Sequence, residues 1–347
     1  MSLYWYTPTP KEHLNSGDQK RVSPNNMANR VFTVQPSELK NIKNKVVVIT
    51  GGASGIGLAT GKLLISLDPS NKIGIIDRSP PPPSFASASN AHRILYQKCE
   101  ITDWKSQRAA FANIARHYGR IDAVYANAGI AEYGDQFFDE TMDASGQLAE
   151  PDRRVLKIDM DAAADTVRLA IHHLRKNPEG GSIVITASLA GYLASAGAGL
   201  YSAAKHGVVG LMRALKQDTK KFNIAISVVA PAITKTPILV GNREAEMNIQ
   251  SGVSTEDAIN QWSEKMSKVG VPINTAEGIA LAVCHLIDGG MQRNGAGYLV
   301  QADKIWDFEA GLAKSREIWM SKEMLDLFRG GRSAPLFTRV DDPKAKM

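Results

Sequence analysis

The sequence predicts a single α/β domain in which a doubly wound parallel sheet carries helices on both faces. Three observations lead to this fold class. Short runs rich in Val and Ile alternate with longer stretches of helical periodicity. The 347 residues, 44% of them hydrophobic, suffice for one large core. A glycine-rich turn lies between the first apolar run and the helix that follows it, which is where such sheets bind ligands.

The apolar runs are the predicted strands. The first two, at 46–49 and 73–76, are short and β-branched, as strands buried on both faces of a sheet are. Because parallel strands end at one edge of the sheet, the side chains that follow them should gather in one site. Further strands are predicted at 94–98, 121–126, 182–187, 225–230 and 297–300, and helices up to residue 67 and at 103–118, 152–175, 201–221 and 275–287.

Segments without this alternation divide the chain. Residues 1–40 are polar and are predicted to be an irregular extension before the ligand-binding domain at 41–310. The segment 79–90 contains four consecutive prolines and is predicted to be a loop. The segment 238–269 is mostly polar and helical, and it is either a lid over the site or a surface excursion.

The C-terminal tail at 311–347 is too apolar for a fully solvated segment. It contains Ile318, Trp319, Leu325 and Phe328. We expect it to dock on its own body, on a partner subunit or over the substrate cleft, and the sequence does not choose among these.

The placement of charge excludes several classes of protein. The net charge is +6, of which residues 1–45 carry +4 and residues 311–347 carry +3, so the body between them is nearly neutral. A nucleic-acid-binding protein places a basic stripe on its folded body, so no nucleic-acid partner is expected. No run of 18 apolar residues is present, so no membrane span is expected.

The sequence further predicts a cytoplasmic protein without a metal site. The first residues lack the basic and apolar segments of a secretory signal. Cys99 and Cys284 are the two cysteines, which fits a reducing compartment. The histidines have no cysteine or carboxylate partners at ligand spacing, so no metal is expected.

A phosphate-binding turn is predicted directly after the first strand. Glycines there allow a tight turn and the close approach of a pyrophosphate, and the N-terminus of the next helix offers unpaired N–H groups. This context predicts a Rossmann-type, dinucleotide-binding sheet. The turn reads Thr50, Gly51, Gly52, Ala53, Ser54, Gly55, Ile56 and Gly57.

The end of the second strand predicts which dinucleotide is bound. Asp77 can accept hydrogen bonds from the two hydroxyls of an adenosine ribose and would repel a 2′-phosphate, which favours NAD over NADP. Arg78 next to it would offset part of that repulsion. Asp103, after the third strand, either faces the adenine, caps the following helix or does both.

A set of three residues that follows the fifth strand predicts the chemistry. Ser188 is followed by Tyr201 and, four residues later, by Lys205, so that the Tyr and Lys share one helix face. A Lys ammonium beside a Tyr hydroxyl favours the phenolate, which can then take a proton from an alcohol or return it to a ketone. Ser188 would hold the same substrate oxygen.

In their order and spacing, these residues resemble the short-chain dehydrogenase/reductase family over about residues 42–305. The resemblance implies that Tyr201 is the acid/base, that Lys205 also binds the nicotinamide ribose and that Ser188 orients the substrate. It is carried by the turn at 50–57, Asp77, Asp103, Ser188, Tyr201 and Lys205, by Asn127, Ala128 and Gly129, and by the segment from Pro231 to Thr236.

The same resemblance implies further roles. Asn127, Ala128 and Gly129 would support the cofactor pocket, and Pro231, Ile233 and Thr236 would lie beside the nicotinamide amide. Assembly as a homodimer or homotetramer is also implied. Two stretches, 188–191 with 204–210 and 294–298, look like 15-hydroxyprostaglandin dehydrogenase and fungal-type members, which suggests a bulky apolar alcohol and a place in secondary metabolism.

One position departs from the family pattern. An Asn inside the helix after the fourth strand is usual, and Asp159 takes its place here. In the family the backbone carbonyl at this position holds a water that links the catalytic Lys to solvent, and Asp159 can keep that role. Its side chain, however, loses a donor and adds a negative charge near Lys205. That charge would partly offset the effect of Lys205 on Tyr201, so we expect an active centre with a more alkaline optimum.

The sequence therefore predicts an NAD-dependent dehydrogenase that oxidises a secondary alcohol on a bulky apolar substrate. Two alternatives stay open. One is an NADPH-dependent ketone reductase of the same fold. The other is a cofactor-binding protein without redox turnover, for which Asp159 leaves room.

Overall fold

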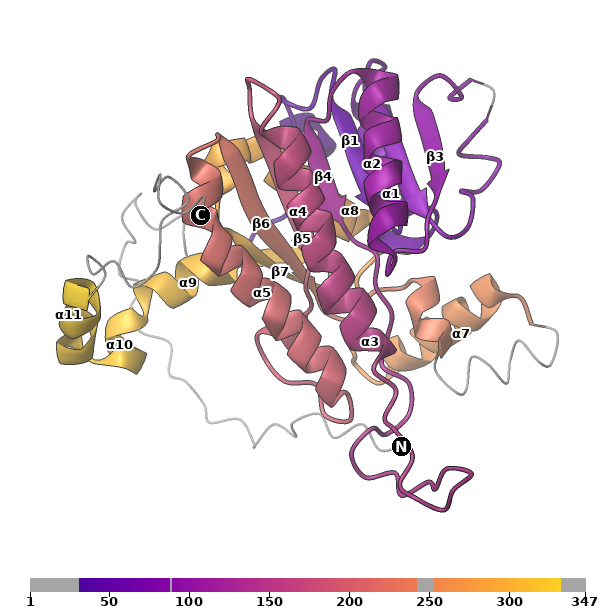
Figure 1. The fold of residues 1–347 in the computed structure, drawn as a ribbon, viewed down its shortest axis with the longest axis vertical. Coiled ribbons are helices and arrows are strands. Elements are labelled where there is room, and N and C mark those ends of the chain that lie inside the picture. The colour runs from indigo at the N-terminus through magenta and orange to yellow at the C-terminus, as the bar shows by residue number, and fades with distance from the viewer. Residues whose placement is uncertain (1–30, 88, 242–252, 332–347) are drawn as a thin grey trace.

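A computed structural model describes residues 31–87, 89–241 and 253–331 (Figure 1). Its centre is one eight-stranded sheet with the order β3-β2-β1-β4-β5-β6-β7-β8. All neighbouring strands are parallel except β7 and β8. The strands are β1 (Val46–Thr50), β2 (Lys72–Asp77), β3 (Ile94–Lys98), β4 (Ala123–Ala126), β5 (Gly181–Thr186), β6 (Ile224–Pro231), β7 (Gly297–Gln301) and β8 (Lys304–Asp307).

The strand order creates the binding crevice. From β1 the chain first builds outward through β2 and β3 and then returns to place β4 on the other side of β1. The loops after β1 and β4 therefore leave the sheet in different directions and open a crevice at the carboxyl ends of the strands. Every residue of β1, β4 and β6 is buried, as their apolar sequences require.

Helices cover both faces of the sheet. In Figure 1, α2, α4 and α5 lie in front of the sheet, and α8 lies behind it. Their apolar sides form two core clusters, one beneath α2, α4 and α5 and the other beneath α1 and α8. The bounds are α1 (Gly55–Leu67), α2 (Trp104–Tyr118), α4 (Ala163–Leu174), α5 (Gly199–Lys220) and α8 (Ala276–Gly289).

The predicted fold class is confirmed, and the seven predicted strands are found within two residues of their expected bounds. β8 was not predicted. It forms a hairpin with β7 through Ala302 and Asp303, which both have positive φ. Hairpin turns of this kind usually contain Gly or Asn, so this pair gives no turn signal.

The predicted helix at 152–175 is divided into three parts. A short α3 (Arg154–Leu156) leads into a π-helical turn, η3 (Lys157–Ala162), and then into α4. π-Turns are frequent at functional sites. This one contains Asp159, and it buries that side chain beneath the crevice.

The end of the predicted extension packs on the core. Phe32 pairs with Ile305 of β8 through two backbone hydrogen bonds of 2.9 and 2.8 Å. Val34 and Leu39 are buried on either side of a short 3-10 helix, η2 (Pro36–Glu38). Residues 1–30 lie outside the described part of the chain.

The segment at 238–269 and the tail are helical where they are described. α7 (Thr255–Lys268) follows the turn η5 (Pro237–Gly241), whereas residues 242–252 lie outside the described part. The tail forms α9 (Phe308–Lys314), α10 (Arg316–Met320) and α11 (Lys322–Gly331), and residues 332–347 are again outside. Leu325 is buried, whereas Ile318 and Trp319 are exposed. Among residues 31–87, 89–241 and 253–331, no helix is long and apolar enough to cross a membrane.

Candidate active site

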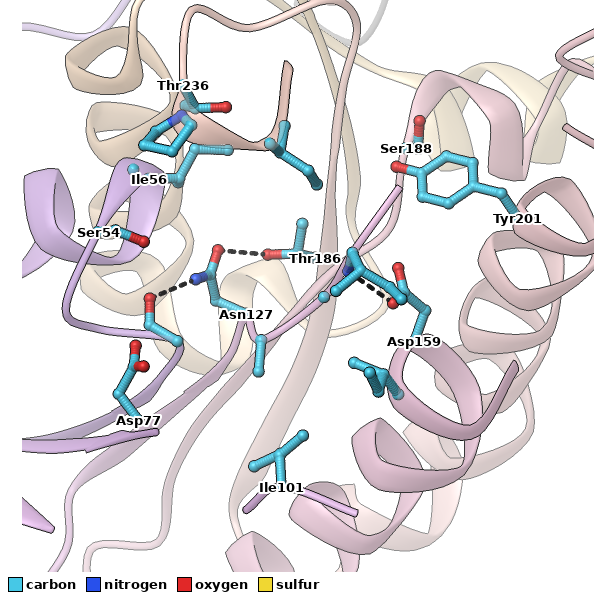
Figure 2. Close-up of a pocket in the computed structure, with 18 of the residues that line it drawn as sticks. Ser54, Ile56, Asp77, Ile101, Asn127, Asp159, Thr186, Ser188, Tyr201 and Thr236 are labelled. Carbon is cyan, nitrogen blue, oxygen red and sulfur yellow. Dashed lines mark hydrogen bonds between the residues drawn. The ribbon is translucent and has the colours of Figure 1, made fainter. Parts of the chain in front are cut away.

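A cavity of about 800 Å³ lies at the carboxyl ends of the parallel strands (Figure 2). It brings together most of the residues that the sequence singled out, although they come from segments far apart in the chain. Those lining it are Gly51, Ser54, Gly55, Ile56, Asp77, Arg78, Asn127, Ala128, Gly129, Asp159, Ser188, Tyr201, Lys205, Pro231 and Thr236.

Four predicted site residues do not line this cavity. Thr50 lies just behind it, where its hydroxyl accepts the N–H groups of Asn127 (3.0 Å) and Ala128 (3.2 Å). Asp103 is the N-cap of α2 and accepts the Lys105 N–H at 2.9 Å, so of its two expected roles the structure shows the cap. The other two are Gly57, buried in α1, and Ile233, whose carbonyl accepts the Asn274 N–H.

The ends of β1, β2 and β4 form one half of the cavity, which we call the phosphate-binding half because the sequence predicts a pyrophosphate there. Gly51 has a φ of +64°, and a Cβ there would lie 2.9 Å from the Ala128 Cα. A Cβ on Gly57 would lie 2.2 Å from the Gly51 carbonyl oxygen. Ser54 is the N-cap of α1, but its side chain caps no N–H, so the first turn of the helix keeps donors for a ligand at the cavity wall.

Asp77 lies at the end of β2 beside this turn. Its carboxylate accepts the N–H groups of Ala53 at 3.0 Å and Ser79 at 3.1 Å. These contacts fix the side chain at the cavity wall, next to Arg78. A carboxylate held there is a ready acceptor for a vicinal diol.

The end of β5, the π-turn η3 and α5 form the other half of the cavity, which we call the catalytic half after the role that the sequence predicts for its residues. Ser188 follows β5 and caps the short helix η4 (Leu189–Gly191) by accepting the Ala190 N–H at 3.1 Å. Tyr201 lies in the first turn of α5 and Lys205 one turn later, with the Lys Nζ 5.5 Å from the centroid of the Tyr ring. In the close-up of the cavity the Tyr201 hydroxyl lies beside Ser188 (Figure 2).

A buried ion pair lies beneath the tyrosine. Lys205 Nζ is 3.1 Å from Asp159 Oδ2, and the two side chains are only 4% and 0% exposed. The Lys ammonium also donates to the Thr186 carbonyl at 3.0 Å. Burial lowers the pKa of Lys205, but the charges of Asp159 and Tyr201 and the hydrogen bond to Asp159 together raise it by more, so this pKa lies above its ordinary value. Lys205 therefore stays charged into the alkaline range.

Asp159 keeps part of the role expected of an amide at its position. Its Oδ1 accepts the Ile130 N–H at 2.8 Å, which an Asn oxygen would also do. Burial raises the pKa of Asp159 against the opposing effect of Lys205. Gly129 makes room for the side chain, because a Cβ there would lie 3.0 Å from Asp159 Oδ2. The expected negative charge near Lys205 is thus placed in direct contact with it.

Thr186 and Glu132 are among the polar residues of this region that sequence reasoning missed. The hydroxyl of Thr186, the last residue of β5, is 2.8 Å from the Tyr125 hydroxyl and can donate to Asn127 Oδ1 at 3.2 Å, and its position at a strand end was a usable signal. Glu132 accepts the backbone N–H of Tyr201 at 2.7 Å. Nothing in the sequence around Glu132 signals that contact, because the two residues are 69 positions apart.

No group of three or more His, Cys, Asp or Glu side chains is placed to hold a metal ion within the described ranges. A nicotinamide cofactor fits the residues present. The open helix N-terminus and the crowded glycines suit a pyrophosphate, and Asp77 suits a ribose.

Comparisons with known proteins agree with this geometry. The protein "Short-chain dehydrogenase/reductase prx4" of Penicillium rubens is 31% identical over 313 residues, which cover 85% of this chain and 86% of that protein. The cis-4-hydroxycyclohexanecarboxylate dehydrogenase of Sinomonas cyclohexanicum is 33% identical over 201 residues, 57% of this chain and 76% of that protein.

The structural comparison leads to the same family. The crystal structure of levodione reductase matches with a TM-score of 0.57 at 25% identity and covers 75% of this chain and 97% of that chain. A family model described as short chain dehydrogenase matches residues 45–248. The chain therefore belongs to the short-chain dehydrogenase/reductase family, whose members are oxidoreductases that bind a nicotinamide cofactor.

Proposed function

We propose that the chain is an NAD-dependent dehydrogenase that oxidises a secondary alcohol on an apolar ring to a ketone. The observation that carries this proposal is the catalytic half of the cavity. Ser188, Tyr201 and Lys205 line one cavity whose other end contains Asp77. The names of two relatives, a hydroxycyclohexanecarboxylate dehydrogenase and levodione reductase, support a cyclic alcohol or ketone as substrate.

The residues divide the proton chemistry among them. Tyr201 takes the proton from the substrate hydroxyl, and the Lys205 charge below its ring stabilises the phenolate that accepts it. Ser188 donates a hydrogen bond to the same substrate oxygen and fixes its position. When bound, the nicotinamide supplies the acceptor for the hydride. Ile130, Tyr133 and Ile238 give the cavity an apolar wall that suits a ring.

The choice of NAD rests on Asp77. Its carboxylate lines the cavity and would repel the 2′-phosphate of NADP. Isothermal titration with each cofactor measures this preference directly, and we expect NAD to bind more tightly.

The activity is tested by mixing the protein with NAD and a panel of secondary alcohols that includes cyclohexanol. Absorbance near 340 nm should rise with at least one cyclic alcohol and should not rise with Tyr201→Phe. Tight NAD binding without reduction across the panel would leave a cofactor-binding protein without redox turnover and would overturn the proposal.

A second candidate is an NADPH-dependent ketone reductase. Arg78 favours it, because this cation lines the same cavity next to Asp77 and can pair with a 2′-phosphate. It requires tighter binding of NADPH than of NADH, together with reduction of a cyclic ketone such as cyclohexanone. The same titrations therefore separate the two candidates.

A further inference from the structure

The start of helix α5 lacks a cap of its own. Its N-cap residue is Ala198, which has no side-chain acceptor, and the first backbone hydrogen bond within the helix is made by the Ser202 N–H. The N–H groups of Gly199, Leu200 and Tyr201 therefore have no partner within the helix. Because Tyr201 lies in this turn, any fraying of the helix start would move the side chain on which the proposed reaction depends.

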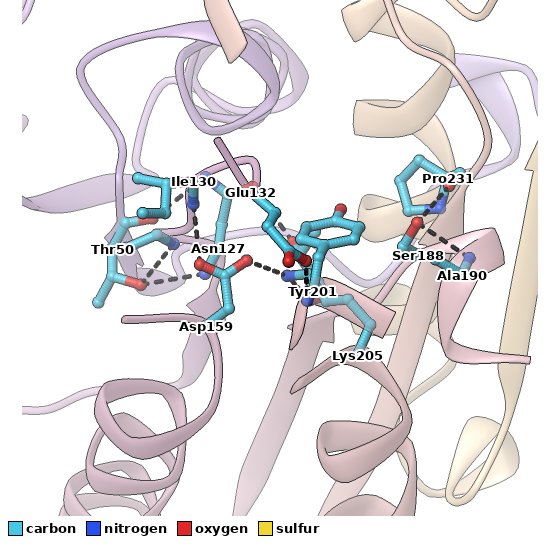
Figure 3. Close-up of polar contacts among 12 residues, drawn as sticks. Thr50, Asn127, Ile130, Glu132, Asp159, Ser188, Ala190, Tyr201, Lys205 and Pro231 are labelled. Atoms are coloured by element: carbon cyan, nitrogen blue, oxygen red, sulfur yellow. Dashed lines mark hydrogen bonds and ion pairs between the residues drawn. The ribbon is translucent and has the colours of Figure 1, made fainter. Parts of the chain in front are cut away.

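Glu132 caps this turn from another part of the chain. It lies in the loop after β4, and its Oε2 accepts the Tyr201 N–H at 2.7 Å (Figure 3). A carboxylate is a favourable group at a helix N-terminus, because it accepts an unpaired N–H and meets the positive end of the helix dipole. Its other oxygen, Oε1, is buried and has no hydrogen-bond partner among the described residues.

The same loop is also joined to the buried ion pair. The Ile130 N–H donates to Asp159, which in turn contacts Lys205. Two residues later, Glu132 contacts the backbone of Tyr201. A closed ring of contacts therefore runs from Lys205 through Asp159, the loop and Glu132 to Tyr201, and α5 itself completes it over one turn.

A second contact joins the loop after β4 to the first turn of α5. The ring of Phe137 lies so close to Gly199 that a Cβ on this glycine would be 2.7 Å from the ring. The loop therefore holds the first turn of α5 by a charge at one point and by packing at another.

We propose that Glu132 is a positioning residue that holds Tyr201 in place for proton transfer. This inference rests on the proposed function for its effect on catalysis. Glu132 does not line the cavity, so it acts through the backbone of Tyr201 and not by touching substrate or cofactor. A displacement of about 1 Å at a reacting group is enough to slow a reaction roughly a hundredfold.

Three variants test the contact itself. Glu132→Ala removes the acceptor, Glu132→Gln keeps an acceptor without the charge, and Glu140→Ala removes an exposed carboxylate of the same loop as a matched control. Hydrogen exchange of the Tyr201 amide, followed with NAD present, should be about tenfold faster in Glu132→Ala. Exchange in Glu132→Gln and Glu140→Ala should stay near that of the natural protein. Unchanged exchange in Glu132→Ala would overturn the proposal.

Kinetics then separate positioning from simple stabilisation. With cyclohexanol as the probe, kcat of Glu132→Ala should fall about tenfold, while KM for NAD stays unchanged and Glu132→Gln recovers most of the loss. Faster amide exchange with an unchanged kcat would mean that Glu132 only stabilises the helix, which also overturns the proposal. If the natural protein does not oxidise cyclohexanol, the proposed function is wrong for this substrate. The amide exchange rates then decide by themselves whether Glu132 holds Tyr201.

Discussion

The two halves of the cavity are built in different ways. The phosphate-binding half depends on backbone groups that approach closely, as Gly51, Gly57 and Ala128 do. The catalytic half depends on buried charge and hydroxyl groups, above all on Lys205 and Asp159. We therefore expect added side-chain volume to impair the phosphate-binding half. The catalytic half should be impaired by the loss of a hydroxyl or a charge even when the side-chain volume stays the same.

The largest effect should come from the catalytic half. Tyr201→Phe removes one oxygen atom and leaves the shape of the side chain nearly unchanged. We expect kcat to fall about 1000-fold, because the proton acceptor is lost. NAD affinity, measured by calorimetry, should not change. Tyr118→Phe on the distant helix α2 is the matched control and should keep full activity; an active Tyr201→Phe enzyme would remove Tyr201 from the mechanism.

Added volume should be most harmful in the phosphate-binding half. Gly57→Ala places a Cβ 2.2 Å from the Gly51 carbonyl oxygen, so the backbone of the turn must shift. We expect NAD affinity to fall about 100-fold and the free energy of unfolding to fall by about 1–3 kcal/mol. Gly210→Ala on α5 is the control, since a Cβ there meets nothing within 4 Å. Calorimetry measures the NAD affinity and thermal unfolding measures the stability of each variant. Equal values for Gly57→Ala and Gly210→Ala would contradict the comparison.

Asp77 is a charged residue in the half of the cavity that otherwise depends on backbone groups. Asp77→Asn keeps an acceptor for the Ala53 N–H but removes the negative charge. We expect the ratio of NAD affinity to NADP affinity to fall about 30-fold, because the repulsion of the 2′-phosphate is lost. Titration of both cofactors measures the ratio. An unchanged ratio would show that the Asp77 charge does not select the cofactor.

The smallest effect should be a shift along the pH axis. Asp159→Asn keeps the acceptor for the Ile130 N–H and removes the anion that raises the pKa of Lys205. Lys205 must be charged to assist Tyr201, so its loss of charge at high pH sets the alkaline limit of activity. Without Asp159 this limit should move to lower pH, because burial would then lower the pKa of Lys205 with less to oppose it.

A profile of kcat/KM against pH measures this limit. The natural protein should therefore have the more alkaline optimum of the two. If the two profiles coincide, the carboxylate has no influence on the proton chemistry.

The sequence predicted the strand, turn and helix of the phosphate-binding half well because local rules determine them. A buried strand, a glycine-rich turn and a helix follow one another from Val46 to Leu67, and each leaves a periodic signal. The carboxyl-end rule also predicts that Asp77, Asn127 and Ser188 lie near one another, and all three line the cavity.

Three features could not be predicted from the sequence, namely β8, the π-turn around Asp159 and the contact between Glu132 and Tyr201. The turn at Ala302 and Asp303 contains neither Gly nor Asn, so no hairpin signal precedes β8. The π-turn around Asp159 has no sequence signature and was absorbed into one long helix. Glu132 reaches Tyr201 through a loop whose path no periodicity determines.

The pairing of Phe32 with Ile305 has a consequence for synthesis on the ribosome. The two residues are 273 positions apart, so the first described segment of the chain must wait unpaired until nearly the whole domain has been made. A chain released before residue 304 would present β7 as an open sheet edge and, with it, a template for pairing with other chains. In the complete fold β8 pairs along this edge, and Phe32 in turn covers part of β8.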